Sequence, residues 1–293
     1  MATLNPILSD FELHQPKQQH FPVVFNSPHS GRNYPTDFIA ASNLNEKALR
    51  SSEDFLVDEL FAGVPALSCP LLKANFPRAF LDVNREPWEL DPKMFSDKLP
   101  GFVTTNSIRI AGGLGTIARK VSERQNIYRD KLTFEHAQTR INRYYFPYHA
   151  ALKQCIKDTH KKFGQVLLID CHSMPSSVGG FFSRQKIKPD IILGDRFGAS
   201  CEGQFVDRLE NLFSRAGLNV ARNRPYAGGY ITAQYGRPHR AVHAIQVEIN
   251  RGLYMNEKTL TRAQGFDKLQ NQLTNVFATF MAEAFPSTAL AAE

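Results

Sequence analysis

The sequence contains only four cysteines among its 293 residues, and no two of them form a C-x-x-C pair. Their wide spacing excludes the cysteine pattern of a zinc ribbon and the cysteine density of a disulfide-stapled scaffold. We therefore expect the thiols to be reduced and mostly buried. They are Cys69, Cys155, Cys171 and Cys201.

Long apolar runs are also missing. No stretch approaches the roughly 18 consecutive apolar residues that span a bilayer. The first twenty residues include Asp10 and Glu12 and few consecutive apolar residues, so they match neither a secretory signal nor a targeting helix. With 42% hydrophobic and 22% charged residues, the composition is typical of a globular protein. The sequence predicts a soluble, cytoplasmic protein that has no membrane partner.

Neither a repeat of fixed period nor a low-complexity linker is present, so we predict a single domain over residues 1–293, with poor order at 1–20 and 285–293. The formal net charge is +7, but the basic residues are dispersed instead of gathered into a stripe. This dispersion disfavours a nucleic-acid partner. Arginines around a pocket for a small anionic substrate would explain part of the charge. The sequence leaves the oligomeric state open.

Three common catalytic motifs are absent as well. The chain has no glycine-rich phosphate loop, no G-x-S-x-G elbow and no H-E-x-x-H helix. These absences weaken an interpretation as a nucleoside triphosphatase, a serine hydrolase or a standard zincin.

What the chain does contain is an alternation of short apolar strands and helices. Strands are predicted at residues 23–26, 80–83, 166–170 and 244–249, and helices at 46–61, 122–163, 199–216 and from about 260. Pro147 should kink or divide the longest helix. This order predicts an α/β fold, a three-layer sandwich in which helices cover a mixed, mostly parallel sheet. In such sheets, reactive residues collect beyond the carboxyl ends of the strands.

Two histidines stand at predicted strand ends. His29 follows the first strand in "SPHSGRNYP", and His172 ends the strand in "LLIDCHSMPSS". Two imidazoles on separate strand ends and one carboxylate are what a mononuclear zinc site needs. Asp170 projects to the same side of the extended chain as His172 and could accept the hydrogen of its other ring nitrogen. The alternative is that each histidine only caps a turn.

The motif "SSEDFLVDELF" offers Glu53 and Asp54 as the third ligand. Both acids would lie in the first turn of a helix capped by Ser51 or Ser52, where the helix dipole favours acidic side chains without any metal. On a helical wheel Glu53 falls inside the apolar stripe, whereas Asp54 lies to one side. Spacing alone does not choose between the two acids.

A candidate carboxylate clamp lies in "RAFLDVNREP". The Arg85 guanidinium can bind a carboxylate through two parallel charge-assisted hydrogen bonds, and the Asn84 amide can add a third. The alternative is a structural ion pair between Asp82 and Arg85.

Glu248 lies on a strongly apolar strand in "HAIQVEINRGLY" and is the candidate general base. A carboxylate on such a strand is costly to bury unless a neighbour holds it or uses it. Beside a zinc-bound water it would take a proton from the water and pass it to the leaving nitrogen. A buried ion pair with Arg251 or another cation is the alternative.

Two further motifs carry candidate substrate contacts. In "YAGGYITAQYGRP", Tyr230 and Thr232 can donate hydrogen bonds after a glycine pair, which suits a mobile loop or a close approach to a ligand. An ordinary turn explains the glycines equally well. The helical motif "RINRYYFPYHAAL" contains Arg143, and the sequence does not show which of its polar residues face a pocket.

Six motifs resemble the N-formylglutamate amidohydrolase family, in the same order and over about residues 22–257. The motifs are "SPHSGRNYP", "EDFLVDELF", "RAFLDVNRE", "LLIDCHSMPS", "AGGYITAQYG" and "HAIQVEINRGLYM". The resemblance implies the α/β sandwich of zinc carboxypeptidases. It also implies hydrolysis of N-formyl-L-glutamate to glutamate and formate, a step of histidine breakdown.

The wider superfamily of zinc carboxypeptidases and aspartoacylase commonly has an H-x-x-E pair, an N-R clamp, a later histidine and a still later glutamate. His29, Asn84–Arg85, His172 and Glu248 stand in that order, but Arg32 occupies the position of the first glutamate. By the resemblance, Asp54 supplies the missing carboxylate. The implied centre is zinc on His29, Asp54 and His172.

The resemblance also implies the remaining roles. Water activated by the metal attacks the formyl carbon, Glu248 moves the proton, and Arg78 helps to stabilise the oxyanion. Arg85 and Asn84 hold one substrate carboxylate. A dianionic substrate also needs a second cationic contact, which Arg143 could provide. The same ligands also accept cobalt, manganese or iron. Close alternatives are a related N-acyl-amino-acid deacylase and a carboxypeptidase-like hydrolase, and the alternative from another class is a non-catalytic ligand-binding protein of the same fold.

Overall fold

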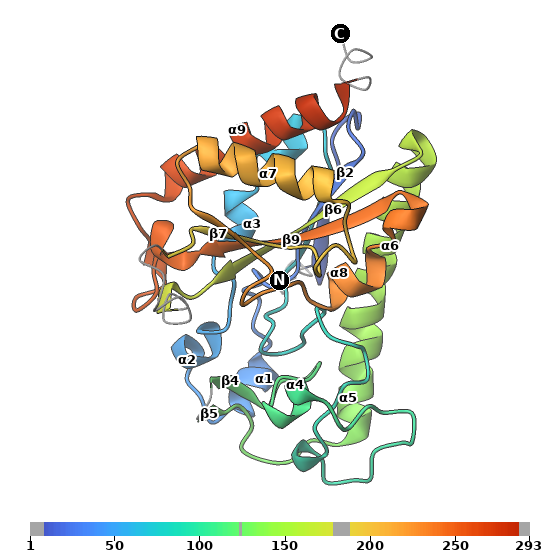
Figure 1. Cartoon of the computed structure of the whole chain (residues 1–293). Coiled ribbons are helices and arrows are strands. Elements are labelled where there is room, and N and C mark those ends of the chain that lie inside the picture. Colours follow the sequence, from blue (N-terminus) through green and yellow to red (C-terminus); the bar gives the residue numbers. More distant parts are fainter. Residues whose placement is uncertain (1–8, 123–124, 178–187, 287–293) are drawn as a thin grey trace, which may run out of the picture.

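A seven-stranded sheet runs through the centre of the computed structural model, which describes residues 9–122, 125–177 and 188–286 (Figure 1). The strand order is β1-β3-β2-β6-β9-β7-β8. The pairs β1–β3 and β7–β9 are antiparallel and the other neighbours are parallel. The bounds are β1 Phe11–His14, β2 Val23–Ser27, β3 Leu71–Ala74, β6 Val166–Met174, β7 Ile191–Gly194, β8 Val220–Arg222 and β9 Val242–Asn250. The predicted mixed, mostly parallel α/β sheet is confirmed.

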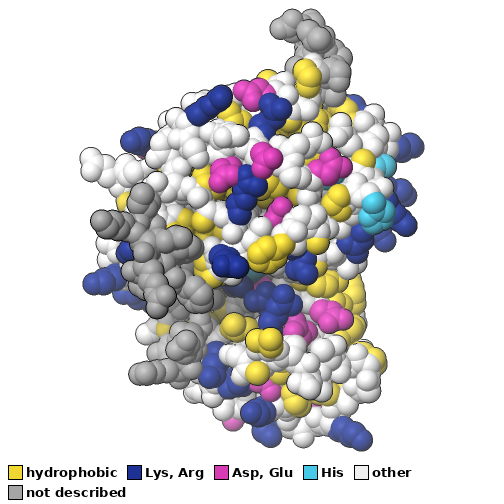
Figure 2. Space-filling model, in the orientation of Figure 1, with side chains coloured by type: hydrophobic (Ala, Val, Ile, Leu, Met, Phe, Trp, Pro, Cys, Tyr) yellow, Lys and Arg dark blue, Asp and Glu magenta, His cyan; other side chains and the backbone are white. Residues whose placement is uncertain are grey.

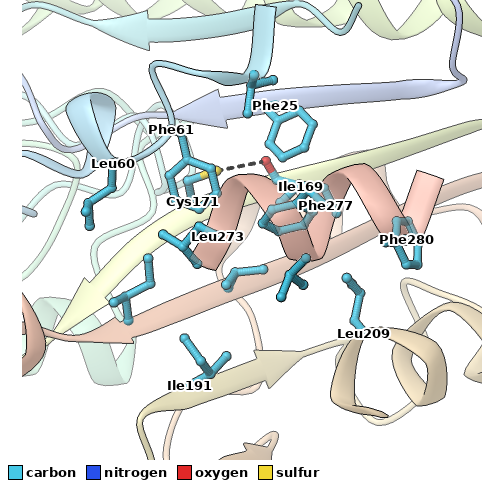
Figure 3. Close-up of a cluster of buried hydrophobic side chains, with 14 of the residues drawn as sticks. Phe25, Leu60, Phe61, Ile169, Cys171, Ile191, Leu209, Leu273, Phe277 and Phe280 are labelled. Carbon is cyan, nitrogen blue, oxygen red and sulfur yellow. Dashed lines mark hydrogen bonds between the residues drawn. The ribbon is translucent and has the colours of Figure 1, made fainter. Parts of the chain in front are cut away.

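Helices cover both faces of this sheet and create two apolar cores. On one face, α3 (Val57–Leu60), α7 (Gly203–Arg215) and α9 (Phe266–Ala284) bury one set of strand residues (Figure 1). Figure 3 shows Phe25 and Ile169 of the sheet packed against Phe277 of α9. On the other face, α6 (Phe146–Phe163) covers Val24 and Leu168. Because side chains alternate along a strand, β2 and β6 contribute to both cores.

Shorter elements lie mostly below the sheet in the view of Figure 1. They include α1 Thr36–Ala40, α2 Glu46–Arg50, α4 Ile108–Ala111, β4 Lys120–Ser122, β5 Gln125–Asn126 and α5 Phe134–Arg140. The others are α8 Tyr230–Tyr235, the hairpin β10 Met255–Asn256 and β11 Thr261–Arg262, and the 3₁₀ turns Val64–Leu67, Pro92–Met94, Pro238–Arg240 and Arg251–Leu253.

The predicted strands at 23–26, 166–170 and 244–249 lie within β2, β6 and β9, whereas the prediction of a strand at 80–83 is wrong. Residues 80–83 form turns and irregular backbone after β3. Their apolar side chains are buried all the same, and the Arg140 guanidinium lies over the Phe80 ring at 4.3 Å from its centroid. A short apolar run indicates burial, which a loop packed under helices satisfies as well as a strand does.

The predicted helix at 46–61 is also wrong as a continuous element. It is divided into α2 and α3, and Leu56, which precedes α3, has a left-handed φ of 57°. The backbone between the two helices turns toward the end of β2, where Asp54 N donates to His29 O at 3.1 Å. Glu53 and Asp54 therefore lie outside any helical first turn, and the helix dipole does not explain them.

The predicted helix at 122–163 begins only at α5 and continues through a π-helical turn, Ile141–Tyr145, into α6. Pro147 stands in the first turn of α6, directly after this irregularity. Proline has no N–H to donate, and the wider i→i+5 hydrogen bonding of the π-helical turn tolerates this missing donor. The predicted helix at 199–216 corresponds to α7. The last helix begins at Phe266 instead of about 260, because the β10–β11 hairpin takes up the preceding residues.

The predicted poor order of the chain ends concerned residues 1–20 and 285–293. β1 lies within the first range and pairs with β3. Of the second such range, residues 287–293 lie outside the described part. The four cysteines are free and buried, as predicted. Within the described ranges, no helix is both long and apolar enough to cross a membrane. Lys and Arg side chains are spread over the face shown in Figure 2.

Candidate metal centre and substrate cavity

Three adjacent parallel strands bring the polar residues together. On β6, the side chains that follow Leu168 on the same face are Asp170 and His172, so this face changes from apolar to polar toward the carboxyl end. The register of β6 against β9 places His172 beside Glu248. β2 lies on the other side of β6 and leads into His29. The convergence at one sheet edge agrees with the prediction from the strand ends.

His29 lies in a tight turn after β2, and the backbone of this turn packs closely against the backbone of Asn75 and Phe76. A Cβ added to Gly31 would lie 2.2 Å from Phe76 O, which is backbone. The side chains of Ser27 and Ser30 are hydrogen-bonded to each other at 2.6 Å. The histidine is therefore fixed between a strand end and a turn that only glycine can complete.

Replacement of Gly31 by alanine tests this packing. We expect Gly31→Ala to lower the free energy of unfolding by about 1–3 kcal/mol, because neither backbone segment can move aside freely. Gly101→Ala is the matched control, since a Cβ at Gly101 meets nothing within 4 Å. Denaturant unfolding of both variants gives the comparison. Equal stability of the two variants would contradict the packing argument.

The buried residues His29, Asp54 and His172 form a candidate metal centre. One ligand atom from each lies within 4.8 Å of the others. Asp54 Oδ2 is 2.9 Å from His172 Nδ1 and 3.4 Å from His29 Nδ1. Two imidazoles and one carboxylate form a ligand set that divalent zinc accepts.

Two further carboxylates bind the opposite ring nitrogens. Asp82 Oδ1 lies 2.7 Å from His29 Nε2, and Asp170 Oδ2 lies 3.0 Å from His172 Nε2. When each Nε2 donates its hydrogen to a carboxylate, Nδ1 of the same ring faces Asp54 and becomes a ligand atom once a bound cation has displaced its proton. His29 Nδ1 is buried and has no hydrogen-bond partner among the described residues. An unpartnered buried nitrogen aimed at a carboxylate and a second imidazole fits a divalent cation.

The role of Asp170 agrees with the sequence prediction, whereas that of Asp82 was missed. The sequence suggested only an ion pair between Asp82 and Arg85, and their closest atoms are 3.8 Å apart. Asp82 instead holds His29 through one oxygen and Arg78 through the other, at 2.9 Å. Its position in the motif beside Asn84 and Arg85 was the available signal, but the partner His29 lies 53 positions away.

Burial and charge act against each other in this cluster. Burial would raise the pKa of Asp54, but His172 and His29 hold it well below its usual value. Burial would likewise raise the pKa of Asp82, which His29, Arg85 and Arg78 keep well below its usual range. For His172, burial would lower the pKa, but Asp170 and Asp54 raise it well above the usual value. Both aspartates are therefore ionised at neutral pH, as metal ligation and imidazole orientation require.

Of the two adjacent acids, Asp54 and not Glu53 faces the histidines. Glu53 accepts a hydrogen bond from Tyr34 Oη at 2.7 Å and pairs with Arg50 at 3.1 Å. Spacing within the motif left this choice open, and the family resemblance implied Asp54. The turn between α2 and α3 places Asp54, and not Glu53, against His172.

Glu248 faces the same cavity from β9. Gln246 Nε2 donates to Glu248 Oε1 at 2.6 Å. Burial raises the pKa of Glu248 to about 7, while the charge of His172 lowers it and that of Asp54 raises it. The alternative of a buried ion pair between Glu248 and Arg251 or another cation is wrong for the described residues, where Glu248 has no basic partner within 4.0 Å and Arg251 pairs with Asp54 instead. A buried carboxylate whose pKa lies near neutrality is suited to accept and return a proton.

A cavity of about 530 Å³ lies over this centre. Its lining includes His29, Asp54, Arg78, Asn84, Arg85, Arg109, Lys120, His172, Tyr226, Gly228, Gly229, Glu248 and Arg251. Basic side chains outnumber acidic ones in this lining, which favours an anionic ligand. Arg109 and Tyr226 were not among the predicted site residues. Arg109 lies in none of the motifs, whereas Tyr226 opens "YAGGYITAQYGRP", from which Tyr230 and Thr232 were chosen instead.

The predicted residues Arg78, Asn84 and Arg85 reach the cavity. Arg85 Nε donates to Leu114 O and its Nη1 to Asn84 O, both at 2.9 Å, so the guanidinium is fixed at the wall. Asn84 Oδ1 accepts from Ile231 N at 2.8 Å. Burial would lower the pKa of Arg78, but the charge of Asp82 raises it, so Arg78 stays cationic.

Three other predicted contacts are not among the described residues that line the cavity. Arg143 is exposed and pairs with Asp10 at 3.4 Å. The Tyr230 ring packs against His149 with 5.8 Å between centroids. Thr232 is fully buried and donates to Gly229 O at 2.9 Å. The glycines reach the cavity, whereas the residues after them turn into α8.

Together, the fold and the site define an α/β protein with a buried candidate centre for a divalent metal ion at the base of an arginine-lined cavity. The chain belongs to the N-formylglutamate amidohydrolase family, whose sequence profile matches residues 21–255.

Individual relatives agree with this assignment. The chain is similar to an N-formylglutamate deformylase of Pseudomonas aeruginosa, with 27% identity over 83% of this chain and 85% of that protein. A second N-formylglutamate deformylase, from Pseudomonas putida, is 25% identical over 82% of this chain and 84% of that protein. A crystal structure of an N-formylglutamate amidohydrolase from Ralstonia eutropha superposes with a TM-score of 0.88 at 38% identity and covers 94% of this chain and 99% of that one.

Proposed function

We propose that this protein is a metal-dependent amidohydrolase that cleaves N-formyl-L-glutamate to glutamate and formate. The observation that carries the proposal is the convergence of two imidazole Nδ1 atoms on Asp54, beside Glu248 and inside a basic cavity. The activities that give the relatives their names support the choice of substrate. We place the reaction in histidine breakdown in the cytoplasm.

His29, Asp54 and His172 would hold the ion, and zinc is the metal we propose. Bound there, it would supply Lewis acidity that lowers the pKa of a water molecule and polarises the formyl oxygen. Asp82 and Asp170 keep the two rings in the tautomer that ligation needs. The chain thus provides a centre whose outer hydrogen bonds are already formed.

Glu248 accepts a proton from the attacking water and delivers it to the amide nitrogen as the bond to the formyl carbon breaks. Arg78, held by Asp82, donates to the formyl oxygen while that oxygen gains negative charge. Arg85 binds one substrate carboxylate at the cavity wall. Arg109, whose nearest acidic partner Glu89 is 3.7 Å away, replaces Arg143 as our candidate for the second carboxylate.

A substrate panel tests this function. Formate or acid release is measured for N-formyl-L-glutamate, N-acetyl-L-glutamate, N-succinyl-L-glutamate and a dipeptide with C-terminal glutamate, with zinc supplied. We expect kcat/KM for N-formyl-L-glutamate to exceed the others by at least about tenfold, since a difference of one methyl group in an acyl-binding site changes kcat/KM by roughly 10- to 200-fold.

Equal kcat/KM on all four compounds would contradict the narrow substrate assignment and favour a broader N-acyl-amino-acid deacylase. Preference for the dipeptide would favour a carboxypeptidase-like hydrolase. No hydrolysis of any compound, together with no zinc in the purified protein, would favour the non-catalytic alternative.

A further inference from the structure

We infer that Arg251 is a positioning residue that turns Asp54 toward the metal, which makes its role distinct from that of the other arginines of the cavity. The inference rests on the proposed function, since it concerns a ligand of the proposed centre. It assigns to Arg251 control of metal affinity and not of substrate affinity.

The contacts of Arg251 divide the two oxygens of Asp54 between two tasks. Arg251 Nη2 donates to Asp54 Oδ1 at 3.1 Å, and Ser173 Oγ donates to the same oxygen at 3.2 Å. The other oxygen, Oδ2, faces His172 Nδ1 and His29 Nδ1. A carboxylate held through one oxygen presents the second in a fixed direction.

Arg251 also connects three separate segments of the chain. Besides Asp54, its Nε donates to Ser173 Oγ on β6 at 3.0 Å and its Nη1 to Ser51 O at 3.3 Å. The Arg251 side chain is 10% exposed and the Asp54 side chain is 1% exposed, so the contact between them is buried. The residue itself begins the 3₁₀ turn that follows β9. A planar, rigid fork is needed to satisfy three partners in these directions, and lysine has no such geometry.

This clamp answers a local need. Asp54 lies between α2 and α3 in backbone without regular secondary structure, so hydrogen bonds to neighbouring segments must fix its side chain. Asp54 N binds His29 O, which fixes the backbone but leaves the carboxylate free to rotate. Arg251 and Ser173 supply the missing constraint.

A substrate-binding role is the competing interpretation, because Arg251 also lines the cavity. Each of its three guanidinium nitrogens already has a protein partner. By contrast, Arg109 lies 3.7 Å from its ion-pair partner Glu89, and the Arg109 side chain is 40% exposed. Three of the five N–H groups of Arg251 are used in this way, and one N–H remains on Nη1 and one on Nη2. The protein contacts fix the guanidinium on Asp54, and the effect on KM separates this role from substrate binding.

Charge and geometry predict opposite effects on metal affinity. The positive charge of Arg251 repels a cation, so loss of the charge alone would strengthen metal binding. Loss of the clamp lets Asp54 rotate and weakens metal binding. We expect the geometric effect to prevail, with the roughly 10- to 100-fold loss of affinity that is typical when a partner of a metal ligand is removed.

The experiment titrates the metal-free full chain with Co²⁺ in the absence of substrate. Competition with a chromophoric chelator gives the dissociation constant, and the visible absorption of Co²⁺ reports the ligand geometry. The variants are Arg251→Lys, which keeps the charge without the fork, Arg251→Met, which loses both, and Ser173→Ala. Arg109→Met is the control, because it removes a cavity arginine that has no contact with Asp54 in the described structure.

We expect Co²⁺ affinity to fall about 10- to 100-fold in both Arg251 variants, by less in Ser173→Ala, and not at all in Arg109→Met, with a changed Co²⁺ spectrum for Arg251→Lys. Thermal unfolding shows whether each metal-free variant is folded. If the Arg251 variants do not fold, Ser173→Ala alone decides, and an unchanged affinity there overturns the inference.

The inference is also overturned if folded Arg251 variants bind Co²⁺ as tightly as the wild-type protein does. The same holds if only their KM for N-formyl-L-glutamate rises. In both cases the proposed function stands. Failure of the wild-type protein to bind Co²⁺ overturns both.

Discussion

Replacing Glu248 with glutamine is expected to lower kcat for N-formyl-L-glutamate by about 10²- to 10⁴-fold, the range for a lost general acid–base group. Glutamine is nearly isosteric and can still hydrogen-bond Gln246, so the fold and the cavity should persist. KM and zinc content should change little, because Glu248 is not one of the three residues of the candidate centre. Steady-state kinetics and metal analysis of the purified variant give all three quantities.

The pH profile provides the matching control for Glu248. Only the carboxylate form accepts a proton, so the rate should rise with pH through the pKa of Glu248. Burial raises this pKa from 4.5 to about 7, and a bound divalent cation lowers it again. We therefore expect an acid limb of kcat/KM between these two values, and its loss in Glu248→Gln. A kcat within about threefold of wild type, or an unchanged acid limb, would exclude Glu248 as the base.

Removal of the metal, or of the carboxylate that binds it, should have an effect of similar size. Dialysis against a chelator is expected to abolish hydrolysis, and zinc or cobalt should restore it. Asp54→Asn should lower zinc affinity by more than the roughly 10- to 100-fold loss seen for residues that only contact a ligand. The reason is that Asp54 Oδ2 is the atom that both imidazoles face.

Glu53→Gln is the control for Asp54→Asn. It changes the adjacent acid in the same way, but its carboxylate contacts Tyr34 and Arg50 instead of the histidines. This variant should keep zinc affinity within about twofold of wild type. The reverse result, with zinc lost from Glu53→Gln and retained by Asp54→Asn, would show that the assignment of the ligand is wrong. Activity that survives complete removal of the metal would show that the hydrolysis does not depend on it.

The strand-end residues could be predicted because the signals are local. β2, β6 and β9 are apolar runs, and His29, His172 and Glu248 stand on or directly after them. Parallel neighbours present their carboxyl ends at one edge, so the identity of the strands is enough to predict that these side chains meet. The prediction of Asp170 as a partner of His172 succeeded for the same reason, since alternation along one strand places them on one face.

The residues that lie in loops could not be placed in this way. Asp54 meets His172 across 118 positions and Asp82 meets His29 across 53. Helical periodicity around residue 54 suggested a continuous helix, and the break at Leu56 is visible only in the fold. Arg143 looked suitable as a second cation because it is basic and near other polar residues, but its position on the helix directs it toward Asp10.

By itself, the sequence predicted the α/β architecture and the positions of His29, His172 and the candidate general base Glu248 at strand ends, because strand periodicity and side-chain alternation follow from backbone geometry within a few residues. Only the tertiary structure showed that Asp54, which the family resemblance implied, faces the histidines while Glu53 does not, that Asp82 contacts His29, and that Arg251 contacts Asp54. These choices depend on hydrogen bonds between segments far apart in the chain, whose directions no local pattern encodes.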